Sequence, residues 1–275
     1  MRELHFFRDP GNPHISVALA GINKLEWVSI DEAATIDEAA RIMSENRFDI
    51  LPITSGEACT HCYKTIIWGK YAIDNVEKHE ITREERLYYL TSIEDVINQF
   101  AITNRKYFFL DNFIEIVGLL SIGNLNCKHV YVYLYNQVIQ LEHKLGSYVY
   151  GKGVTDKELV QLFETKTDSS NAVESLDRYR NDDAEAMDYN FLEYIYLTDF
   201  RFIFKHFDFT KNLNLSNKVF TGMLISINEI RRVVAHPNKS LIRNDKSIHK
   251  VNEAIRTMDI LLEKINAINS DSVKA

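Results

Sequence analysis

Arg231 and His236 are the two side chains whose types and spacing best suit chemistry in this 275-residue sequence. Apolar residues recur every three or four positions in the segment around them, which predicts a helix with one buried face: Leu224, Ile227, Ile230 and Val234. Pro237 disfavours helical geometry at the residue before it, so we expect this helix to end at or near His236. The imidazole would then lie where the helix dipole favours its protonated form.

An imidazole that moves protons and a guanidinium that stabilises charge suit reactions at phosphate, and cleavage of RNA without a metal ion is one reaction open to such a pair. The 2′-oxygen of RNA can attack the adjacent phosphate, so a protein need only move protons and stabilise charge. We expect His236 to act as general acid and base and Arg231 to stabilise the negative charge on the phosphate. Arg232 would be an auxiliary phosphate contact, and Asn228 would help to position the substrate. One histidine and one arginine make a small set, so a two-fold dimer that joins two sets is expected.

The segment Asn228–Arg231 followed by Val234–Pro237 resembles the signature of the HEPN superfamily, small all-α domains of which many are metal-independent ribonucleases. The resemblance covers about the last half of the chain. It implies an Arg-x4–6-His motif near the end of a long helix, with two copies meeting across a homodimer interface to form one active site. Arg232 stands where the family commonly has a small polar residue. Two structural alternatives therefore stay open: His236 caps its helix, and Arg231 pairs with an acid on another helix.

Composition places the chain among soluble globular proteins. An apolar share of 45% and a charged share of 26% are ordinary for that class, and the length allows two compact domains. The first residues lack the apolar run of a secretory signal, and no segment approaches the roughly 20 apolar residues that span a bilayer. Three cysteines, an odd number in a large chain, favour a reducing compartment. We expect a cytoplasmic protein with no membrane partner.

Charge is distributed unevenly along the chain. The net charge is −7, which by itself argues against nucleic-acid binding. Residues 201–275, however, contain 13 Lys and Arg against 7 Asp and Glu. The basic excess thus falls around the Arg-x4-His helix, as a surface that binds RNA would require, although a solvated helical face would give the same count.

The N-terminal half shows strand-like patterns. Residues 1–23 are interpreted as an N-terminal arm or a lone strand. A β-prone segment, Trp27–Ile30, is followed by a helix that Thr35 can cap, and strands are expected within Asn46–Ile53 and at Thr65–Trp68. The sequence of residues 36–46 and 51–53 in this β-α-β-β order resembles a CBS motif, the repeat named after cystathionine β-synthase.

A second copy of the same order is expected about 60 residues later. Strands are predicted at Tyr88–Leu90, Tyr107–Asp111 and Ile114–Leu120, with a helix from Thr91 to about Ile102. The resemblance implies that two CBS copies, about 24–75 and 85–127, pair into one Bateman module over residues 24–127, since one copy cannot bury its sheet alone. The predicted fold class is α+β: this pair, then an all-α helical bundle over 128–269 and a tail at 270–275.

The CBS resemblance also implies a nucleotide site in the second copy. Gly118, Ser121 and Asn124 match the family phrase in which glycine allows close approach, a hydroxyl contacts phosphate and an acid contacts ribose; Asp111 completes the predicted set. The usual ligands are adenine nucleotides such as AMP, ADP and ATP. Asn124 replaces the acid, and a neutral hydrogen bond is weaker than a charge-assisted one. The alternative is a CBS pair that serves only as a dimerisation scaffold.

A metal site is considered and not predicted. Cys59, His61 and Cys62 lie close in sequence in what is expected to be a loop. They supply two or three ligands where zinc needs four. Cys127 and His129 could complete a site only through an accident of folding. Ordinary thiols are the favoured interpretation, and no metal or cofactor is expected to be required for catalysis.

From residue 129 onward the apolar period is helical. Five helical segments are predicted, together with an acidic surface stretch at Glu164–Asn190 that includes some helix: Val130–Leu145, Thr155–Phe163, Phe191–Phe207, Lys218–His236 and Ser247–Ile268. Phe191–Phe207 is apolar nearly all round, which predicts a buried helix or one shared with a partner subunit.

Two functions follow from these patterns. The first is a nucleotide-regulated, metal-independent endoribonuclease of the HEPN type, in a toxin-like or defence system. The second is a non-catalytic, nucleotide-sensing protein that dimerises through its helical domain, and through the CBS pair as well, and binds a partner or RNA without cutting it. The intact Arg231/His236 pair favours the first, and Arg232 and Asn124 favour the second.

Overall fold

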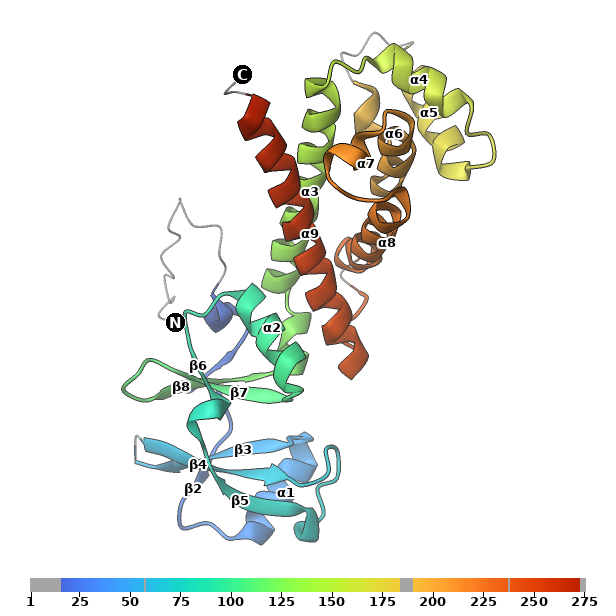
Figure 1. Cartoon of the computed structure of the whole chain (residues 1–275). Coiled ribbons are helices and arrows are strands. Elements are labelled where there is room, and N and C mark those ends of the chain that lie inside the picture. The colour runs from blue at the N-terminus through green and yellow to red at the C-terminus, as the bar shows by residue number, and fades with distance from the viewer. Residues whose placement is uncertain (1–15, 57, 184–189, 237, 273–275) are drawn as a thin grey trace. The chain divides into compact units, whose positions relative to one another are not determined.

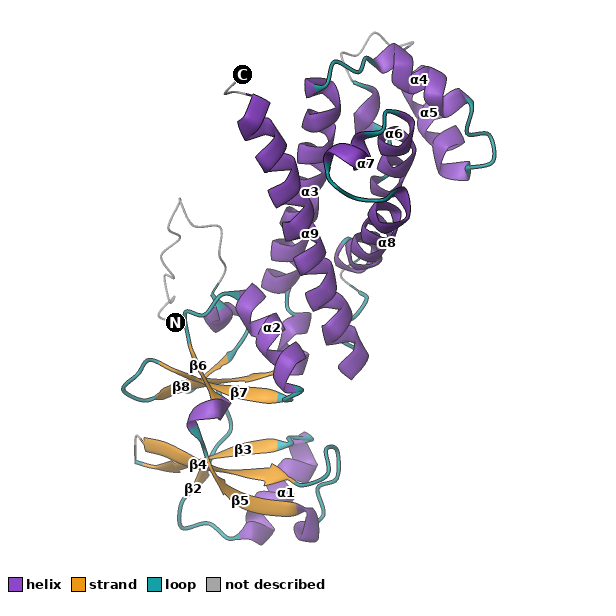
Figure 2. Cartoon of the chain, viewed as in Figure 1, coloured by secondary structure: helices purple, strands orange, loops and turns teal. Residues whose placement is uncertain are grey.

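The computed structural model describes residues 16–56, 58–183, 190–236 and 238–272. It has two small sheets in the N-terminal half and helices in the C-terminal half, so the chain is a mixed α+β protein (Figures 1 and 2). It divides into two compact units, Met1–Val130 and Tyr131–Ala275, called here the strand-rich unit and the helical unit. None of the helices in the described residues is both long and apolar enough to cross a membrane.

The strand-rich unit contains the same four-stranded sheet twice. The first sheet has the order β2-β3-β4-β5, and the second has the order β6-β7-β8-β1. In each, the first pair of strands is parallel and the next two pairs are antiparallel. The strands are β1 (Ile22–Asn23), β2 (Ile30–Asp31), β3 (Ile50–Ser55), β4 (Ala58–Thr65), β5 (Val76–Glu80), β6 (Arg86–Tyr88), β7 (Tyr107–Asp111) and β8 (Ile116–Ser121).

The two repeats exchange their leading strands. β1 precedes the first repeat in the chain, yet it pairs with β8 of the second, where Ile22 lies opposite Leu119. β5 precedes the second repeat, yet it pairs with β4 of the first. The second sheet is therefore complete only when the segment before the first repeat joins it, whereas the first sheet is formed within residues 30–80. The predicted 1–23 arm thus ends in a strand of the second sheet, while residues 1–15 lie outside the described part.

One helix lies within each repeat, between its two parallel strands. α1 (Ile36–Asn46) begins at Thr35, whose hydroxyl accepts a hydrogen bond from the Glu38 amide, as predicted. α2 (Ile93–Thr103) begins in the same way at Ser92. Both end at a residue in the left-handed conformation, Arg47 or Asn104, which stops the helix and turns the chain into the next strand. The apolar face of α1 packs on the first sheet through Ala39, Ala40 and Met43.

The strands around Cys59 and Cys62 lie elsewhere than predicted. β4 contains both cysteines and ends at Thr65, so this segment is a strand and not a loop. The predicted strand at Thr65–Trp68 is wrong, because Ile66, Ile67 and Trp68 form an exposed connection. The register explains the difference: Cys62 lies opposite both Pro52 and His79, so β4 is the central strand between β3 and β5. The second copy is closer to expectation, with β6 two residues earlier than predicted and β8 starting at Ile116.

The helical unit is built from α3 (Lys128–Gly151) onward. The remaining helices are α4 (Asp156–Glu164), α5 (Ser170–Asp183), α6 (Phe200–His206), α7 (Phe209–Asn212), α8 (Asn217–Val234) and α9 (Asp245–Ser272). Buried aromatic rings form its core: Phe204 stacks on Phe220 with centroids 4.5 Å apart, and Tyr148 stacks on Phe204 at 5.7 Å. This packing holds α3, α6 and α8 together.

The predicted continuous helix at Phe191–Phe207 is wrong. The segment forms two short 3-10 turns, Phe191–Glu193 and Leu197–Asp199, before α6 starts at Phe200. Asn190 and Tyr196 start these turns in extended conformation, and the buried Asp199 accepts a hydrogen bond from the Tyr196 amide. The apolar residues of this segment were correctly predicted to be buried. They lie, however, on two 3-10 turns and α6 and not on one helix.

Candidate functional site

The Arg-x4-His segment lies at the end of α8. Ser216 caps the helix start. The predicted apolar stripe of Leu224, Ile227, Ile230 and Val234 is buried, and Phe220 extends it towards the start of the helix. The helix ends at Val234, two residues before the predicted limit. The Ala235 amide makes the last helical hydrogen bond, to the carbonyl of Arg231, and His236 follows in a bend with an exposed side chain. Pro237 lies outside the described residues.

The two arginines of the motif have different environments. The Nε of Arg231 lies 3.2 Å from the Oε1 of Glu142 on α3, and the two side chains are 30% and 28% exposed. Arg232 is exposed to solvent. Positions four apart share a helical face, so Arg232 lies on the exposed side that leads to His236, whereas Arg231 faces a neighbouring helix. The expected alternative, in which Arg231 pairs with an acid on another helix, is the one observed; Asn228 is half-buried on the turn before.

The connection between α8 and α9 is anchored and basic. Tyr131 of α3 donates a hydrogen bond to the carbonyl of Lys239 at 2.6 Å and accepts one from the Leu241 amide at 2.8 Å. These two bonds hold the connection against α3. Exposed cations lie near His236 in the sequence, at the end of α8, along this connection and at the start of α9. This set is called here the basic cluster: Arg232, His236, Lys239, Arg243, Lys246 and Lys250.

One cation of the basic cluster is paired with a described carboxylate. Glu229, one turn before Arg232, lies 3.1 Å from Lys250 in an exposed ion pair that joins α8 to α9. The other exposed cations of the cluster have no carboxylate within ion-pair distance among the side chains that the structure describes. An anionic polymer would therefore meet several cations that have no paired carboxylate among the described side chains, together with an exposed imidazole.

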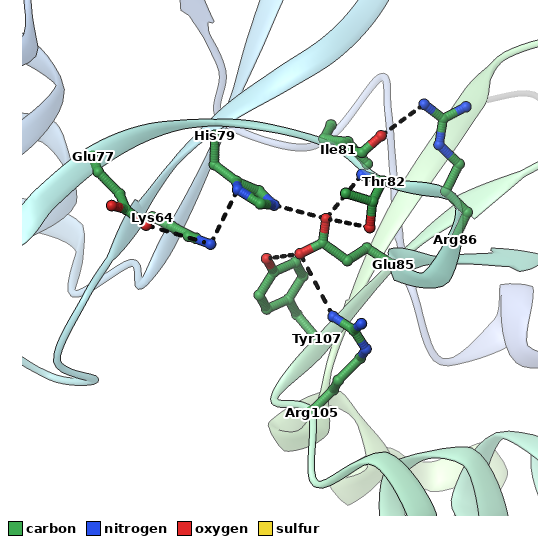
Figure 3. Close-up of polar contacts among 9 residues, drawn as sticks. All are labelled: Lys64, Glu77, His79, Ile81, Thr82, Glu85, Arg86, Arg105 and Tyr107. Atoms are coloured by element: carbon green, nitrogen blue, oxygen red, sulfur yellow. Dashed lines mark hydrogen bonds and ion pairs between the residues drawn. The ribbon is translucent and has the colours of Figure 1, made fainter.

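A second polar centre lies in the strand-rich unit, around Glu85 (Figure 3). Its side chain is 4% exposed and accepts hydrogen bonds from Tyr107 Oη at 2.7 Å and from the Thr82 amide at 2.9 Å. His79 Nε2 lies 2.8 Å away, and Arg105 Nη1 lies 3.6 Å away. Burial raises the pKa of Glu85, but the hydrogen bonds from Tyr107, Thr82 and His79 outweigh it and lower the pKa to about 2. The carboxylate is thus ionised at neutral pH.

His79 extends this centre from one sheet to the other. Lys64 Nζ lies 3.1 Å from His79 Nδ1, and a lysine can only donate, so Nδ1 accepts and the Nε2 proton points to Glu85. Lys64 and His79 belong to β4 and β5 of the first sheet, whereas Tyr107 belongs to β7 of the second. The chain of contacts therefore ties the two repeats together (Figure 3). No spacing in the sequence signalled it.

A hollow of about 660 Å³ lies beside this centre, in the second repeat. Its lining contains two arginines, one acid, the last residues of α2 and apolar side chains: Glu84, Arg86, Leu87, Gln99, Thr103, Asn104, Arg105 and Phe108. Arg86 donates from Nη2 to the Ile81 carbonyl at 3.0 Å, while its buried Nε has no hydrogen-bond partner among the described residues. Arg105 belongs both to the hollow and to the Glu85 centre. A small ligand in this hollow would meet two guanidinium groups.

The predicted nucleotide residues do not line the hollow, and three of them, Gly118, Ser121 and Asn124, have roles in the fold. The amide and hydroxyl of Ser121 both donate to Asn124 Oδ1, at 2.7 and 2.8 Å, which closes the 3-10 helix Ile122–Asn126. A Cβ on Gly118 would lie 2.7 Å from the carbonyl oxygen of Ile22, so the exchanged strand requires glycine there. Asp111 lies at the other end of β7 from Ser121, about 13 Å away by the rise of four residues.

The cysteines of β4 are poor candidates for metal ligands. Both are buried, and burial raises the pKa of Cys59 to about 11 and that of Cys62 to about 12, so the thiols stay protonated. His61 directs Nδ1 to the Thr60 hydroxyl at 3.0 Å. Across the described residues, no group of three or more His, Cys, Asp or Glu side chains is placed to hold a metal ion.

Comparisons of this chain with protein-family models and with curated proteins found no match.

Proposed function

We propose that this protein is a metal-independent endoribonuclease whose helical unit cuts RNA and whose strand-rich unit senses an adenine nucleotide. The observation that carries the proposal is the exposed imidazole of His236 within the basic cluster at the end of α8. An imidazole in that position can exchange protons with solvent and with a bound phosphodiester, and the surrounding cations attract RNA.

In the proposed reaction, His236 takes the proton of the 2′-hydroxyl as the oxygen attacks phosphorus. The same ring, or that of a second protomer, returns a proton to the leaving 5′-oxygen. Arg231 and Arg232 stabilise the charge that develops on the non-bridging oxygens. Because each chain supplies one such set, the active enzyme is a homodimer. An exposed apolar stripe on α3, formed by Val132, Tyr135 and Ile139, supports association through the helical unit.

The proposed regulatory part is a CBS pair. Support comes from the repeated order of a strand, a helix and two strands, and from β1, which precedes the first repeat and completes the sheet of the second. The hollow that contains Arg86 and Arg105 is the candidate ligand site, with guanidinium groups facing phosphate. In this proposal, nucleotide binding to the strand-rich unit regulates the helical unit. The protein belongs to a toxin-like or defence system and works in the cytoplasm.

A non-catalytic function is the second candidate. It is favoured by one observation, the ion pair between Arg231 and Glu142, because a paired guanidinium is less available to a phosphate. In that case the basic cluster would hold RNA without cutting it, and the nucleotide would control assembly.

The test is incubation of the purified full-length chain with total RNA in EDTA, with and without ATP or AMP. His236→Ala is compared with His206→Ala, a matched change at an exposed histidine of α6 outside the basic cluster. We expect cleavage that persists in EDTA, is lost in His236→Ala and is retained in His206→Ala. Cleavage that requires added divalent ions, or that survives in His236→Ala, removes the assignment. RNA binding without cleavage supports the second candidate.

A further inference from the structure

Glu142 lies in α3, far from the Arg-x4-His segment in sequence, yet it contacts that segment directly. Its Oε1 is 3.2 Å from Arg231 Nε, and both residues belong to the helical unit. The two side chains are about 30% exposed, so water screens this pair less than it screens a surface pair. By comparison, the neighbouring pair of Glu229 and Lys250 has side chains that are 56% and 65% exposed.

The geometry divides the guanidinium of Arg231 into an inner and an outer part. The inner nitrogen, Nε, is buried against Glu142 and makes no well-aligned hydrogen bond among the described residues. The contact with Glu142 is therefore a charge contact that restrains the side chain without saturating its five donors. The side chain keeps 30% of its exposure, so its remaining donors are accessible to a ligand.

Resting on the proposed function, we propose that Glu142 is the positioning residue for Arg231 and that it holds the guanidinium for contact with an RNA phosphate. A long arginine side chain loses rotamer freedom when it binds a phosphate, and a fixed inner edge removes part of that cost before RNA arrives. The partly buried carboxylate also needs a cation beside it, because burial raises its pKa and Arg231 opposes that effect. Glu142 thus holds the Arg231 side chain in position, and Arg231 favours the ionised form of Glu142.

The test compares Glu142→Gln with Glu164→Gln, a matched loss of an acid from the exposed ion pair with Arg180, outside the basic cluster. Single-turnover cleavage in EDTA, the RNA dissociation constant and the unfolding midpoint are measured for both and for Arg231→Ala. We expect Glu142→Gln to cut about tenfold or more slowly, with a smaller change in RNA affinity, and Glu164→Gln to cut at the wild-type rate. In the Arg231→Ala background, Glu142→Gln should cause no further loss of rate.

Several outcomes would overturn the inference. A purely structural pair would lower the unfolding midpoint of Glu142→Gln and leave the rate unchanged. Additive losses of rate in the double variant would show that the two residues act separately. A wild-type protein that binds RNA without cutting it contradicts the proposed function alone, and the same cycle is then measured in RNA affinity. A wild-type protein that neither binds nor cuts RNA removes both.

Discussion

Glu85 and Glu142 are both carboxylates withdrawn from water, and their surroundings push them in opposite directions. Glu85 receives hydrogen bonds from Tyr107, Thr82 and His79, and these lower its pKa although burial raises it. Glu142 has a cation beside it, and burial still keeps its pKa above the ordinary value. The number of hydrogen-bond donors around the carboxylate, and not burial alone, decides whether its pKa is raised or lowered. The strand-rich unit thus contains a carboxylate held by several hydrogen bonds, while the carboxylate of the helical unit has a charge contact with Arg231.

The largest expected effect on stability comes from removing the Glu85 carboxylate. Glu85→Ala leaves the donors of Tyr107, Thr82 and His79 without an acceptor and should lower the unfolding free energy of the strand-rich unit by about 3–5 kcal/mol. The chain's two tryptophans, Trp27 and Trp68, both lie in that unit, so urea unfolding followed by their fluorescence measures it separately. A loss below about 1 kcal/mol would mean that the network does not join the repeats.

The next effect is the pH dependence of the same unit. Because the pKa of Glu85 is about 2 when folded and 4.5 ordinarily, its ionised form stabilises the fold above pH 4.5. That contribution, about 3 kcal/mol, is lost as pH falls from 4.5 towards 2. Urea unfolding at pH 6 and at pH 3 should show a decline in the wild type that is smaller in Glu85→Gln. Parallel declines in the two proteins would contradict the assignment.

The smallest effect concerns Glu142 and has the opposite sign. A carboxyl group whose folded pKa is raised stabilises the fold when protonated, and it loses that contribution as pH rises through the folded pKa. Arg231→Ala removes the opposing cation, so the helical unit of this variant should lose stability more steeply on raising pH from 5 to 8 than the wild type does. Thermal unfolding followed by circular dichroism measures the difference, and the double variant Glu142→Gln with Arg231→Ala should lose this extra dependence.

The sequence could predict the features that depend on local pattern. Thr35 and Ser92 signalled the starts of α1 and α2, and the apolar period gave the buried stripe of α8. It could not predict the exchange of leading strands, because β1 is only two residues long and its partner, β8, lies about 95 residues away. Phe191–Phe207 was taken for a helix because composition shows burial but not backbone shape.

The candidate sites divide in the same way. His236 and Arg232 could be identified from their spacing, and both side chains are exposed. The pairing of Arg231 with an acid was anticipated as an alternative, but its partner could not be identified, since Glu142 lies on a different helix. The Glu85 centre was missed because Lys64, His79 and Tyr107 come together only when two sheets are in place.

The proposed role of His236 in moving protons during RNA cleavage is tested by the pH dependence of the cleavage rate. The rate of single-turnover cleavage of an end-labelled RNA in EDTA is followed from pH 5 to pH 8 for the wild type and for His236→Ala. We expect a wild-type rate that depends on pH and a loss of at least about a hundredfold in the variant. Equal rates in the two proteins would contradict it.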